Sequence, residues 1–180
     1  MRAQRRGFTL VELVLVLLLL ALLLAVAAPS LSLLRERMAT LQAFHALTAG
    51  LAQARMAAVA LGRPVTLCPS ADGRSCRGDL VWDAGWLVYV DATRSPQPAK
   101  DEDVLWTEAL APGPVAIRAT PGRHRVRYQP TGMSGGNNAS LRLCSRKRAV
   151  HLGSVVVNIA GRVRHARVSR VDPPPCPFLP

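Results

Sequence analysis

Residues 10–28 form an almost unbroken apolar run, and this run constrains the fold more than any other feature of the chain. It contains one acid, Glu12, and no basic residue. About twenty apolar residues are enough for a helix to cross a bilayer at 1.5 Å per residue. Because Arg2, Arg5 and Arg6 precede the run, the positive-inside rule predicts one membrane-spanning helix with a cytoplasmic N-terminus and the rest of the chain outside.

The residues around the start of this run carry a processing motif. The heptapeptide Gly7-Phe8-Thr9-Leu10-Val11-Glu12-Leu13 resembles the class III leader of type IV pilins and type II secretion pseudopilins. The resemblance implies that a prepilin peptidase removes residues 1–7 and methylates the amine of Phe8. Conventional signal-peptide cleavage after Ala25–Ala28 is the alternative, which the following Pro29 disfavours.

Glu12 is unusual because a carboxylate inside a membrane helix costs a few kcal/mol. It is therefore expected to have a partner charge. The resemblance implies that this partner is the freed N-terminal ammonium of the same or the neighbouring subunit, which sets the register during assembly. Snorkelling of Glu12 to the membrane interface is the alternative.

The helix is predicted to continue beyond residues 8–28, its membrane half. Pro29 removes one intrahelical hydrogen bond and predicts a bend. Residues 29–62 carry an amphipathic stripe, with residues 35–37 turned elsewhere. Its outer half is expected to pack on the sheet of the head and its inner half on other subunits of a filament. Its members are Leu31, Leu34, Met38, Leu41, Phe44, Thr48, Leu51, Arg55 and Ala58. Gly62 and Pro64 predict the end of the helix.

After Pro64 the pattern changes to short extended runs bounded by Gly, Pro, Asp or Asn. The runs are 65–68, 80–90, 104–110, 115–120, 125–129, 140–144, 154–159 and 162–170. Strands that follow one long helix predict an α+β fold. We expect residues 63–171 to form one β-rich head and residues 172–180 a proline-rich tail. Residues 158–161 are predicted to form a hairpin turn with Gly161 at positive φ.

Four short segments of the head carry a second resemblance. They are Val65-Thr66-Leu67-Cys68, Trp82 with residues 85–91, Leu141-Arg142-Leu143-Cys144, and Gly161-Arg162-Val163-Arg164. Together they resemble the GspH/FimT family, and with the leader the resemblance covers the chain to about residue 170. It implies a type IV pilin-like fold, in which a long N-terminal helix packs on an antiparallel head. Trp82 and Trp86 are expected in the core of the head rather than in a ligand site.

The four cysteines form an even set with neither C-x-x-C spacing nor paired histidines, so no metal site is predicted. Outside the cytoplasm, disulfides are the expected state. Of the three possible connectivities, we favour Cys68 with Cys76, which closes a local loop, and Cys144 with Cys176, which ties the tail to a strand. One pair remaining as buried thiols is the alternative.

The positive charge is concentrated in the second half of the chain. Residues 109–180 carry 12 Lys and Arg against 1 acid, whereas residues 1–108 carry 11 against 10. Residues 109–171 contain no acid at all. Such an imbalance attracts polyanions, so nucleic acid or an anionic surface is the natural partner class. A solvated cationic face is the alternative.

Within this basic half, one motif points to DNA. In FimT-like proteins a C-terminal Gly-Arg-x-Arg motif is implicated in DNA contact, and Gly161-Arg162-Val163-Arg164 matches it. On a strand, Arg162 and Arg164 would share one face about 6.6 Å apart and could hold backbone phosphates without reading bases. The alternative is that they only protect an edge strand. The auxiliary DNA-binding residues are predicted to be Arg146, Lys147, Arg148, Arg167 and Arg170. Arg94, outside the basic half, is expected to tolerate glutamine.

These features predict a minor pilin that binds DNA, independently of base sequence, for uptake in natural transformation. Pseudopilin H of a type II secretion system, a structural subunit at the filament tip, is the alternative. The expected partners are a prepilin peptidase, other pilins or pseudopilins, and the inner membrane, with the head in the periplasm. No enzyme activity or cofactor is predicted, because residues 131–138 lack the Gly-Lys-Ser/Thr of a phosphate loop and no histidine has a visible catalytic partner.

Overall fold

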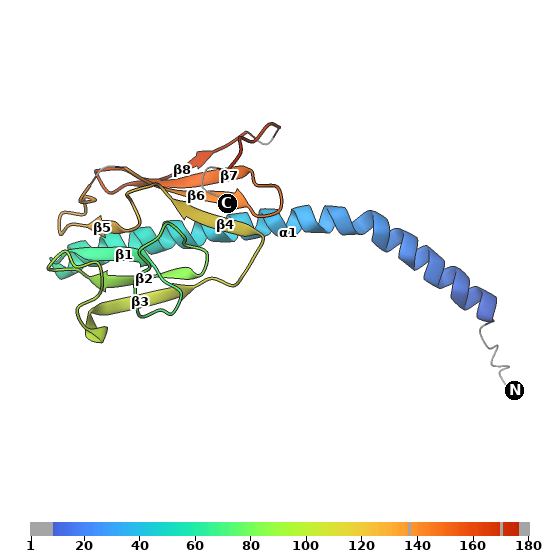
Figure 1. The fold of residues 1–180 in the computed structure, drawn as a ribbon, viewed down its shortest axis with the longest axis horizontal. Coiled ribbons are helices and arrows are strands. Elements are labelled where there is room, and N and C mark those ends of the chain that lie inside the picture. The colour runs from blue at the N-terminus through green and yellow to red at the C-terminus, as the bar shows by residue number, and fades with distance from the viewer. Residues whose placement is uncertain (1–8, 137, 170, 177–180) are drawn as a thin grey trace, which may run out of the picture.

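A computed structural model, which describes residues 9–136, 138–169 and 171–176, shows one long helix and a β-rich head (Figure 1). Helix α1 (Leu10–Leu61) runs along the head with its C-terminal part and projects from it with its N-terminal part, which curves (Figure 1). The predicted α+β class is confirmed. Gly7 and Phe8, at the predicted cleavage site, lie outside the described residues.

Both ends of α1 are capped. The Oγ1 atom of Thr9 accepts a hydrogen bond from the N–H of Glu12 at 3.2 Å, so Glu12 lies in the first turn, where the helix dipole favours a carboxylate. At the other end Gly62 has a φ of 62°, and its N–H donates to the carbonyl of Val59. Glycine adopts this left-handed cap without steric strain. The predicted end of the helix is therefore confirmed.

The head consists of two four-stranded antiparallel sheets. The first has the order β3-β2-β1-β5 and contains β1 (Val65–Pro69), β2 (Gly85–Val90), β3 (Val104–Ala109) and β5 (Val126–Tyr128). The second has the order β4-β6-β7-β8 and contains β4 (Val115–Ala119), β6 (Ala139–Ser145), β7 (His151–Val157) and β8 (Val163–Arg167). A short 3₁₀ helix, η1 (Asp101–Asp103), precedes β3.

Each predicted run overlaps one strand, and the largest differences are in the runs 80–90 and 162–170. The run 80–90 becomes regular only at Gly85, because the preceding residues hydrogen-bond to the other sheet. The N–H of Trp82 donates to the carbonyl of Ile117 at 3.0 Å. The last run becomes a strand only at Val163, so Arg162 lies in the turn before β8.

The core lies between α1 and the two sheets, both of which α1 contacts. Its helical side chains are small or aliphatic: Ala43, Leu47, Leu51, Ala54 and Ala58. Of the predicted stripe, Leu51 and Ala58 in the outer half are buried against the head. The members of the inner half, which are predicted to pack on other subunits, are each about half exposed: Leu31, Leu34, Met38 and Leu41. The stripe did not include Ala43, Leu47 and Ala54, which are also buried in the core.

Trp82 and Trp86 are fully buried, as predicted. Their ring centroids lie 6.5 Å apart in the core. Gly50 of α1 makes room for one of them, because a Cβ atom there would lie 2.8 Å from Nε1 of Trp86. Gly50 therefore allows α1 to pack closely on the first sheet, with the Trp86 indole between them.

Both predicted disulfides are present. Cys68 and Cys76 close the loop after β1 with their Cα atoms 5.6 Å apart, and Cys144 and Cys176 join β6 to the tail at 5.8 Å. Within the first loop, Asp72 Oδ1 accepts backbone N–H bonds from Arg74 and Ser75, which hold the pKa of this carboxyl well below its usual range. The tail also pairs with the β6–β7 turn, since the N–H of Cys176 donates to the carbonyl of Ala149 at 2.7 Å.

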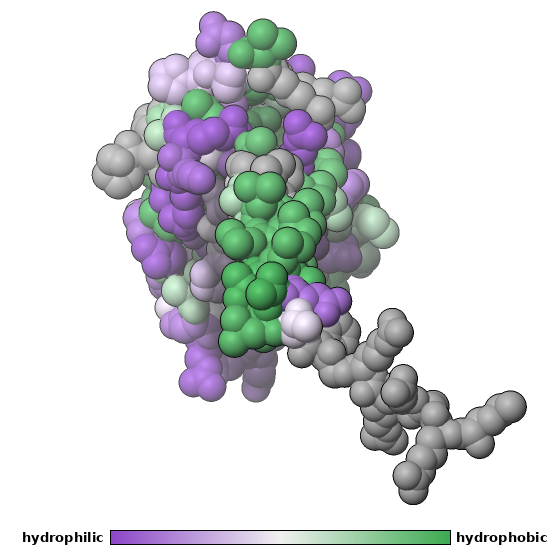
Figure 2. All heavy atoms as spheres, turned by 90° about the vertical axis from the view of Figure 1, so that its right-hand side faces the viewer, coloured by the Kyte–Doolittle hydropathy of each residue, from purple (hydrophilic) through white to green (hydrophobic). Residues whose placement is uncertain are grey.

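The projecting half of α1 exposes apolar side chains. They extend from Leu10 to Leu24, and Figure 2, viewed from this end, shows a green apolar patch bordered by hydrophilic residues of the head. Within the described part of the chain, no helix combines the length and the apolarity needed to cross a membrane.

Candidate nucleic-acid interface

The predicted Gly-Arg-x-Arg motif leads into β8, the edge strand of the second sheet. Arg164 pairs with Val156 of β7, and His165 pairs with Val155. His165 faces the helix, because its Nε2 lies 2.7 Å from Oγ1 of Thr48 and its ring centroid 5.0 Å from that of Phe44. Side chains alternate along a strand, so Arg164 lies on the opposite, outward face.

Arg162 is held by the hairpin turn rather than by the strand. Its N–H donates to Oδ1 of Asn158 at 2.9 Å, and its carbonyl accepts from the N–H of Asn158 at 3.1 Å. Gly161, just before it, has a φ of 75°. The predicted turn is confirmed, but the predicted strand conformation of Arg162 is wrong, because the Asn158 side chain binds the N–H that would otherwise begin the ladder.

Gly161 is a positioning residue rather than a ligand-binding one. It is buried, and a Cβ atom at this position would lie 2.0 Å from the carbonyl oxygen of Gly132. That carbonyl is itself fixed by a 2.9 Å hydrogen bond from Nε of Arg55. The motif therefore needs glycine so that the turn can pack against the 129–132 loop and present Arg162 to solvent.

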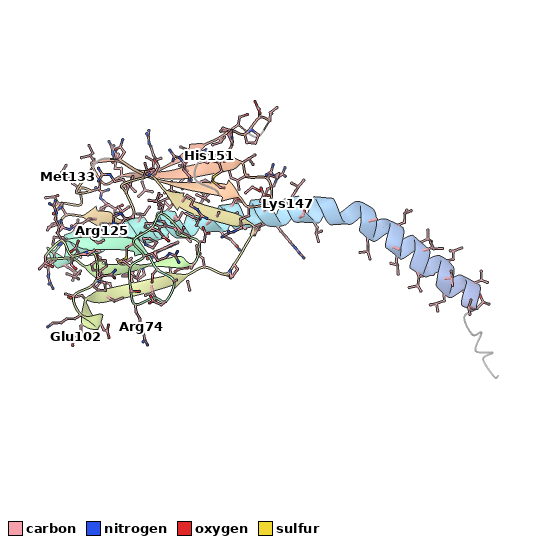
Figure 3. All side chains as sticks on the ribbon, viewed as in Figure 1. Arg74, Glu102, Arg125, Met133, Lys147 and His151 are labelled. Carbon is pink, nitrogen blue, oxygen red and sulfur yellow. A yellow bond between two sulfur atoms is a disulfide. The ribbon has the colours of Figure 1, made fainter. Side chains whose placement is uncertain are left out.

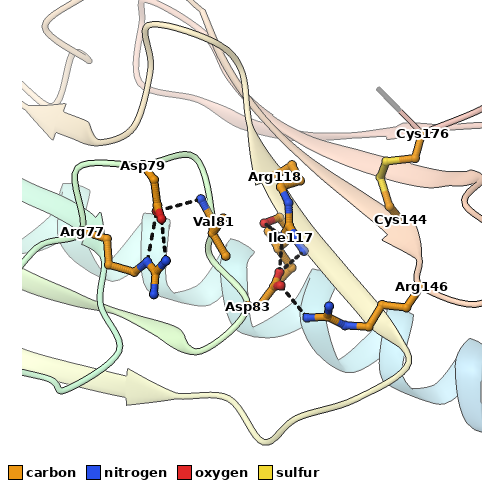
Figure 4. Close-up of polar contacts among 9 residues, drawn as sticks. All are labelled: Arg77, Asp79, Val81, Asp83, Ile117, Arg118, Cys144, Arg146 and Cys176. Carbon is orange, nitrogen blue, oxygen red and sulfur yellow. Dashed lines mark hydrogen bonds and ion pairs between the residues drawn. A yellow bond between two sulfur atoms is a disulfide. The ribbon is translucent and has the colours of Figure 1, made fainter. Parts of the chain in front are cut away.

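Acids from the first half of the chain neutralise part of the basic half. Asp83 accepts a hydrogen bond from Arg118 at 2.5 Å and pairs through its other oxygen with Arg146 (Figure 4). Its Oδ1 also accepts the N–H of Ile117 at 2.6 Å. Arg146, predicted as an auxiliary DNA ligand, is therefore already paired with a carboxylate.

Arg148, a second predicted auxiliary, pairs with Glu36 of α1. Glu36 also accepts a 2.9 Å hydrogen bond from Oγ of Ser145 and is buried, so the prediction that it turns away from the packed face was wrong. These contacts fasten the β6–β7 turn to the helix. Lys147 of the same turn is exposed (Figure 3) and has no ion pair with a described residue.

The structure separates the two basic groups that the sequence analysis combined in one interface. Residues 146–148 lie in the turn before β7, and Arg162 lies in the turn after it. The 7 residues of β7 span about 20 Å at about 3.4 Å per residue. Arg170 lies outside the described residues. Arg167 is placed in β8 opposite Gly153.

A third basic group, which the sequence did not reveal, lines a cleft of about 250 Å³. Four arginines contribute to it: Arg94, Arg123, Arg125 and Arg127. Arg94 comes from the loop after β2, so the tertiary structure brings it to residues of the acid-free half. Arg94 is therefore close to the basic half in space although it lies outside that half in the sequence. The alternation of arginine at positions 123, 125 and 127 was the one available signal.

Among the described residues, no group of His, Cys, Asp and Glu could hold a metal ion. The ring of His151 has two polar contacts. Its Nε2 lies 2.8 Å from Oγ of Ser154 and 3.0 Å from the carbonyl oxygen of Gly153. Burial lowers the pKa of His151, which disfavours the protonated ring.

A long helix that packs its C-terminal half on an antiparallel head and projects its apolar N-terminal half defines a type IV pilin-like subunit. The prokaryotic N-terminal methylation motif matches residues 2–28. This motif implies processing by a prepilin peptidase and assembly with other pilins, and it indicates a membrane-anchored subunit. The family described as type II transport protein GspH matches residues 43–161. The chain belongs to the GspH family, whose members are structural pilin-like subunits.

Two crystal structures of the type IV minor pilin FimU from Pseudomonas aeruginosa share this fold. One aligns with a TM-score of 0.58 at 17% identity over 78% of this chain and 96% of FimU. The other aligns with a TM-score of 0.52 at 16% identity over 71% and 91%. No curated protein matches the sequence. The likeness to FimU concerns the fold alone and confirms the predicted pilin-like architecture.

Proposed function

We propose that this chain is a minor pilin of a type IV pilus that binds DNA through backbone phosphates for uptake in natural transformation. The observation that carries the proposal is the state of Arg162 and Arg164. Both are exposed, and neither side chain has a hydrogen bond or ion pair with a described residue. Arg118, Arg127 and Arg146, by contrast, are paired with carboxylates.

The shape of the site favours contact with phosphates rather than with base edges. Base readout in the major groove uses an inserted helix or a two-stranded ribbon. Here the two arginines lie on a turn and on a single edge strand, where the planar guanidinium can hold two phosphate oxygens. Binding should therefore be independent of base sequence and should weaken steeply with salt, because each neutralised phosphate releases counterions.

The proposal also assigns a place to the N-terminal segment. Residues 8–28 would anchor the chain in the inner membrane, with residues 1–7 removed and the head in the periplasm. The exposed leucines of α1 support this anchor. Glu12 lies in the exposed first turn without an ion pair to a described residue, so its carboxylate is accessible to the ammonium of Phe8 from its own or a neighbouring subunit.

The test compares the Arg162→Gln/Arg164→Gln variant with Arg74→Gln, each as full-length chain in a non-ionic detergent. Arg74 is exposed, its side chain has no described partner, and it lies on the side of the head away from β8 (Figure 3). Mobility shifts with duplex DNA across a salt series should give weaker binding for the double variant. Its log–log salt slope should be shallower by about 0.9 for each phosphate that the variant no longer binds.

Lysine at both positions should recover only part of the affinity, because an ammonium keeps the charge but not the planar fork. Wild-type affinity and slope in the double glutamine variant, with normal transformation of the cell, would refute the proposal.

Pseudopilin H of a type II secretion system is the second candidate, favoured by the description of the matching family. In that role the head would bind other pseudopilins at a filament tip and would need no polyanion. A strain that lacks the chain and loses protein secretion, while it still takes up DNA, would favour this candidate.

A further inference from the structure

The arginine-lined cleft lies where the two sheets meet at one end of the head. Its walls are β5 of the first sheet, the first residue of β6 of the second, the loop that contains Arg94 and the loop 134–136. Figure 3 labels Arg125 and Met133 at this end, which is the end away from the projecting half of α1. The cleft is distinct from the outward face of β8 that carries Arg164.

Three guanidinium groups of the cleft have no carboxylate partner among the described residues. Arg123 and Arg125 are half-buried and Arg94 is exposed. Arg125 has two described partners: its Nη1 donates to the carbonyl oxygen of Ser95 at 2.9 Å, and its guanidinium also interacts with the hydroxyl of Tyr89. The fourth guanidinium, of Arg127, is neutralised by Asp91 at 2.8 Å.

Among the described residues, none of those that line the cleft is acidic. Partial burial removes water from a cation, so half-buried guanidiniums without a counter-charge favour the arrival of an anion.

The backbone holds two of these arginines in place. Arg94 has a φ of 61°, in the left-handed region that residues other than glycine adopt uncommonly and often at functional sites. Arg123 packs on the backbone of Gly136, because a Cβ atom there would lie 2.5 Å from Nη1 of Arg123. The main chain therefore sets the direction in which the Arg94 side chain leaves its loop, and it contacts the guanidinium of Arg123 directly.

The cleft is next to the turn that presents Arg162. The N–H of Ser134, in the cleft wall, donates to the carbonyl of Ile159 in that turn at 3.0 Å. Ala139, in the cleft, and Val163, at the start of β8, pair with the same residue of β7. They are two strand spacings apart, about 10 Å. That distance equals about three axial steps of 3.4 Å between phosphates on one DNA strand.

We propose that the cleft is a phosphate-binding subsite that takes a backbone phosphate of DNA a few nucleotides from those held by Arg162 and Arg164. This inference rests on the proposed DNA binding and extends it to a second point of contact. Guanidinium groups bind the oxygens of a phosphate in pairs, and Arg94 and Arg123 have all their donors free of described partners.

The experiment uses three full-length variants in a non-ionic detergent. The cleft variant is Arg94→Gln/Arg123→Gln, the edge variant is Arg162→Gln/Arg164→Gln, and Arg74→Gln is the matched control. Each protein is titrated with an oligodeoxythymidylate across a salt series, and its melting temperature is measured with and without inorganic phosphate. The melting temperature without phosphate shows whether each variant folds. If the glutamine substitutions impair folding, lysine at positions 94 and 123 provides a second variant that retains the charge.

If the cleft holds phosphate, inorganic phosphate should raise the melting temperature of the wild type, the control and the edge variant, but not of the cleft variant. The salt slope for the oligonucleotide should be shallower by about 0.7 in the cleft variant, because the subsite holds one phosphate of a single strand. An unchanged phosphate effect together with an unchanged slope would overturn the inference.

The outcomes separate this inference from the proposed function. If the edge variant binds the oligonucleotide as the wild type does, the proposed DNA contact at β8 is wrong. The subsite is still supported in that case if inorganic phosphate raises the melting temperature of every protein except the cleft variant. A parallel arm adds phosphatidylglycerol to the detergent micelles and measures the melting temperature. If the lipid raises the melting temperature of the wild type but not of the cleft variant, and oligonucleotide binding is unchanged in that variant, the phosphate comes from a membrane and the DNA assignment of the cleft is overturned.

Discussion

Replacement of Gly161 by alanine should disturb DNA binding indirectly, through the turn that presents Arg162. Two features of the structure determine the expected cost. The residue has a φ of 75°, and a left-handed conformation costs a residue other than glycine about 1–2 kcal/mol. A Cβ atom would also lie 2.0 Å from the carbonyl oxygen of Gly132. Because backbone must move to relieve this overlap, a further cost of about 1–3 kcal/mol is expected.

The assay is chemical denaturation of the full-length chain, followed by DNA titration under native conditions. Gly161→Ala should lower the free energy of unfolding by about 2–5 kcal/mol, the sum of the two contributions. Gly62→Ala is the matched control, since Gly62 has a φ of 62° but open space around its Cα. It should show only the conformational cost of about 1–2 kcal/mol.

Equal decreases of stability in the two variants would refute the argument that the close approach to Gly132 makes Gly161 necessary. Arg162→Gln provides the other comparison. It should weaken DNA binding while leaving the free energy of unfolding close to that of the wild type, because Arg162 is exposed and has no described side-chain partner.

Three further predictions concern stability. Gly50→Ala, which usually stabilises a helix interior by about 1 kcal/mol, should instead lower the melting temperature, because the new Cβ would lie 2.8 Å from Nε1 of Trp86; a rise would contradict this. Because burial lowers the pKa of His151 from its ordinary value of 6.5, the unfolded state binds more protons below that pH, so stability should fall as the pH is lowered through 6.5. His151→Gln should flatten this dependence, and an unchanged pH profile would count against it. Replacing both Cys144 and Cys176 by serine should lower the free energy of unfolding by about 4 kcal/mol, and replacing Cys68 and Cys76 should lower it by about 2.5 kcal/mol, because the longer loop has the larger closure entropy. The reverse order in a denaturant titration would contradict this entropic explanation.

Several parts of the fold follow from local patterns along the chain. Gly62 ends α1 because a glycine cap and a nearby proline act within one turn of the helix. The strands and the turn at Asn158–Gly161 follow from short apolar runs separated by turn-forming residues. The disulfide pairs were predictable because one pair is close in sequence and the other joins a strand to the tail.

The arrangement of charge did not follow from such patterns. The sequence indicated one basic half, yet folding pairs Arg146 with Asp83 and Arg148 with Glu36, two acids far away in the chain. It also moves Arg94 into the basic cleft. The predicted stripe on α1 included Leu51 and Ala58 but omitted Ala43, Leu47 and Ala54, which are also buried against the head.

By itself, therefore, the sequence determined the class of this protein: the leader motif, the apolar run, the helix end, the strands and the cysteine pairs each depend on residues close together or on covalent chemistry. Only the tertiary structure decided which arginines remain available to a polyanion. Electrostatic pairing depends on distance in space and falls off within a few ångströms in water, whereas position along the chain sets no such distance. The two exposed arginines at β8 and the three cleft arginines are among the cations that have no carboxylate partner within the described part of the chain.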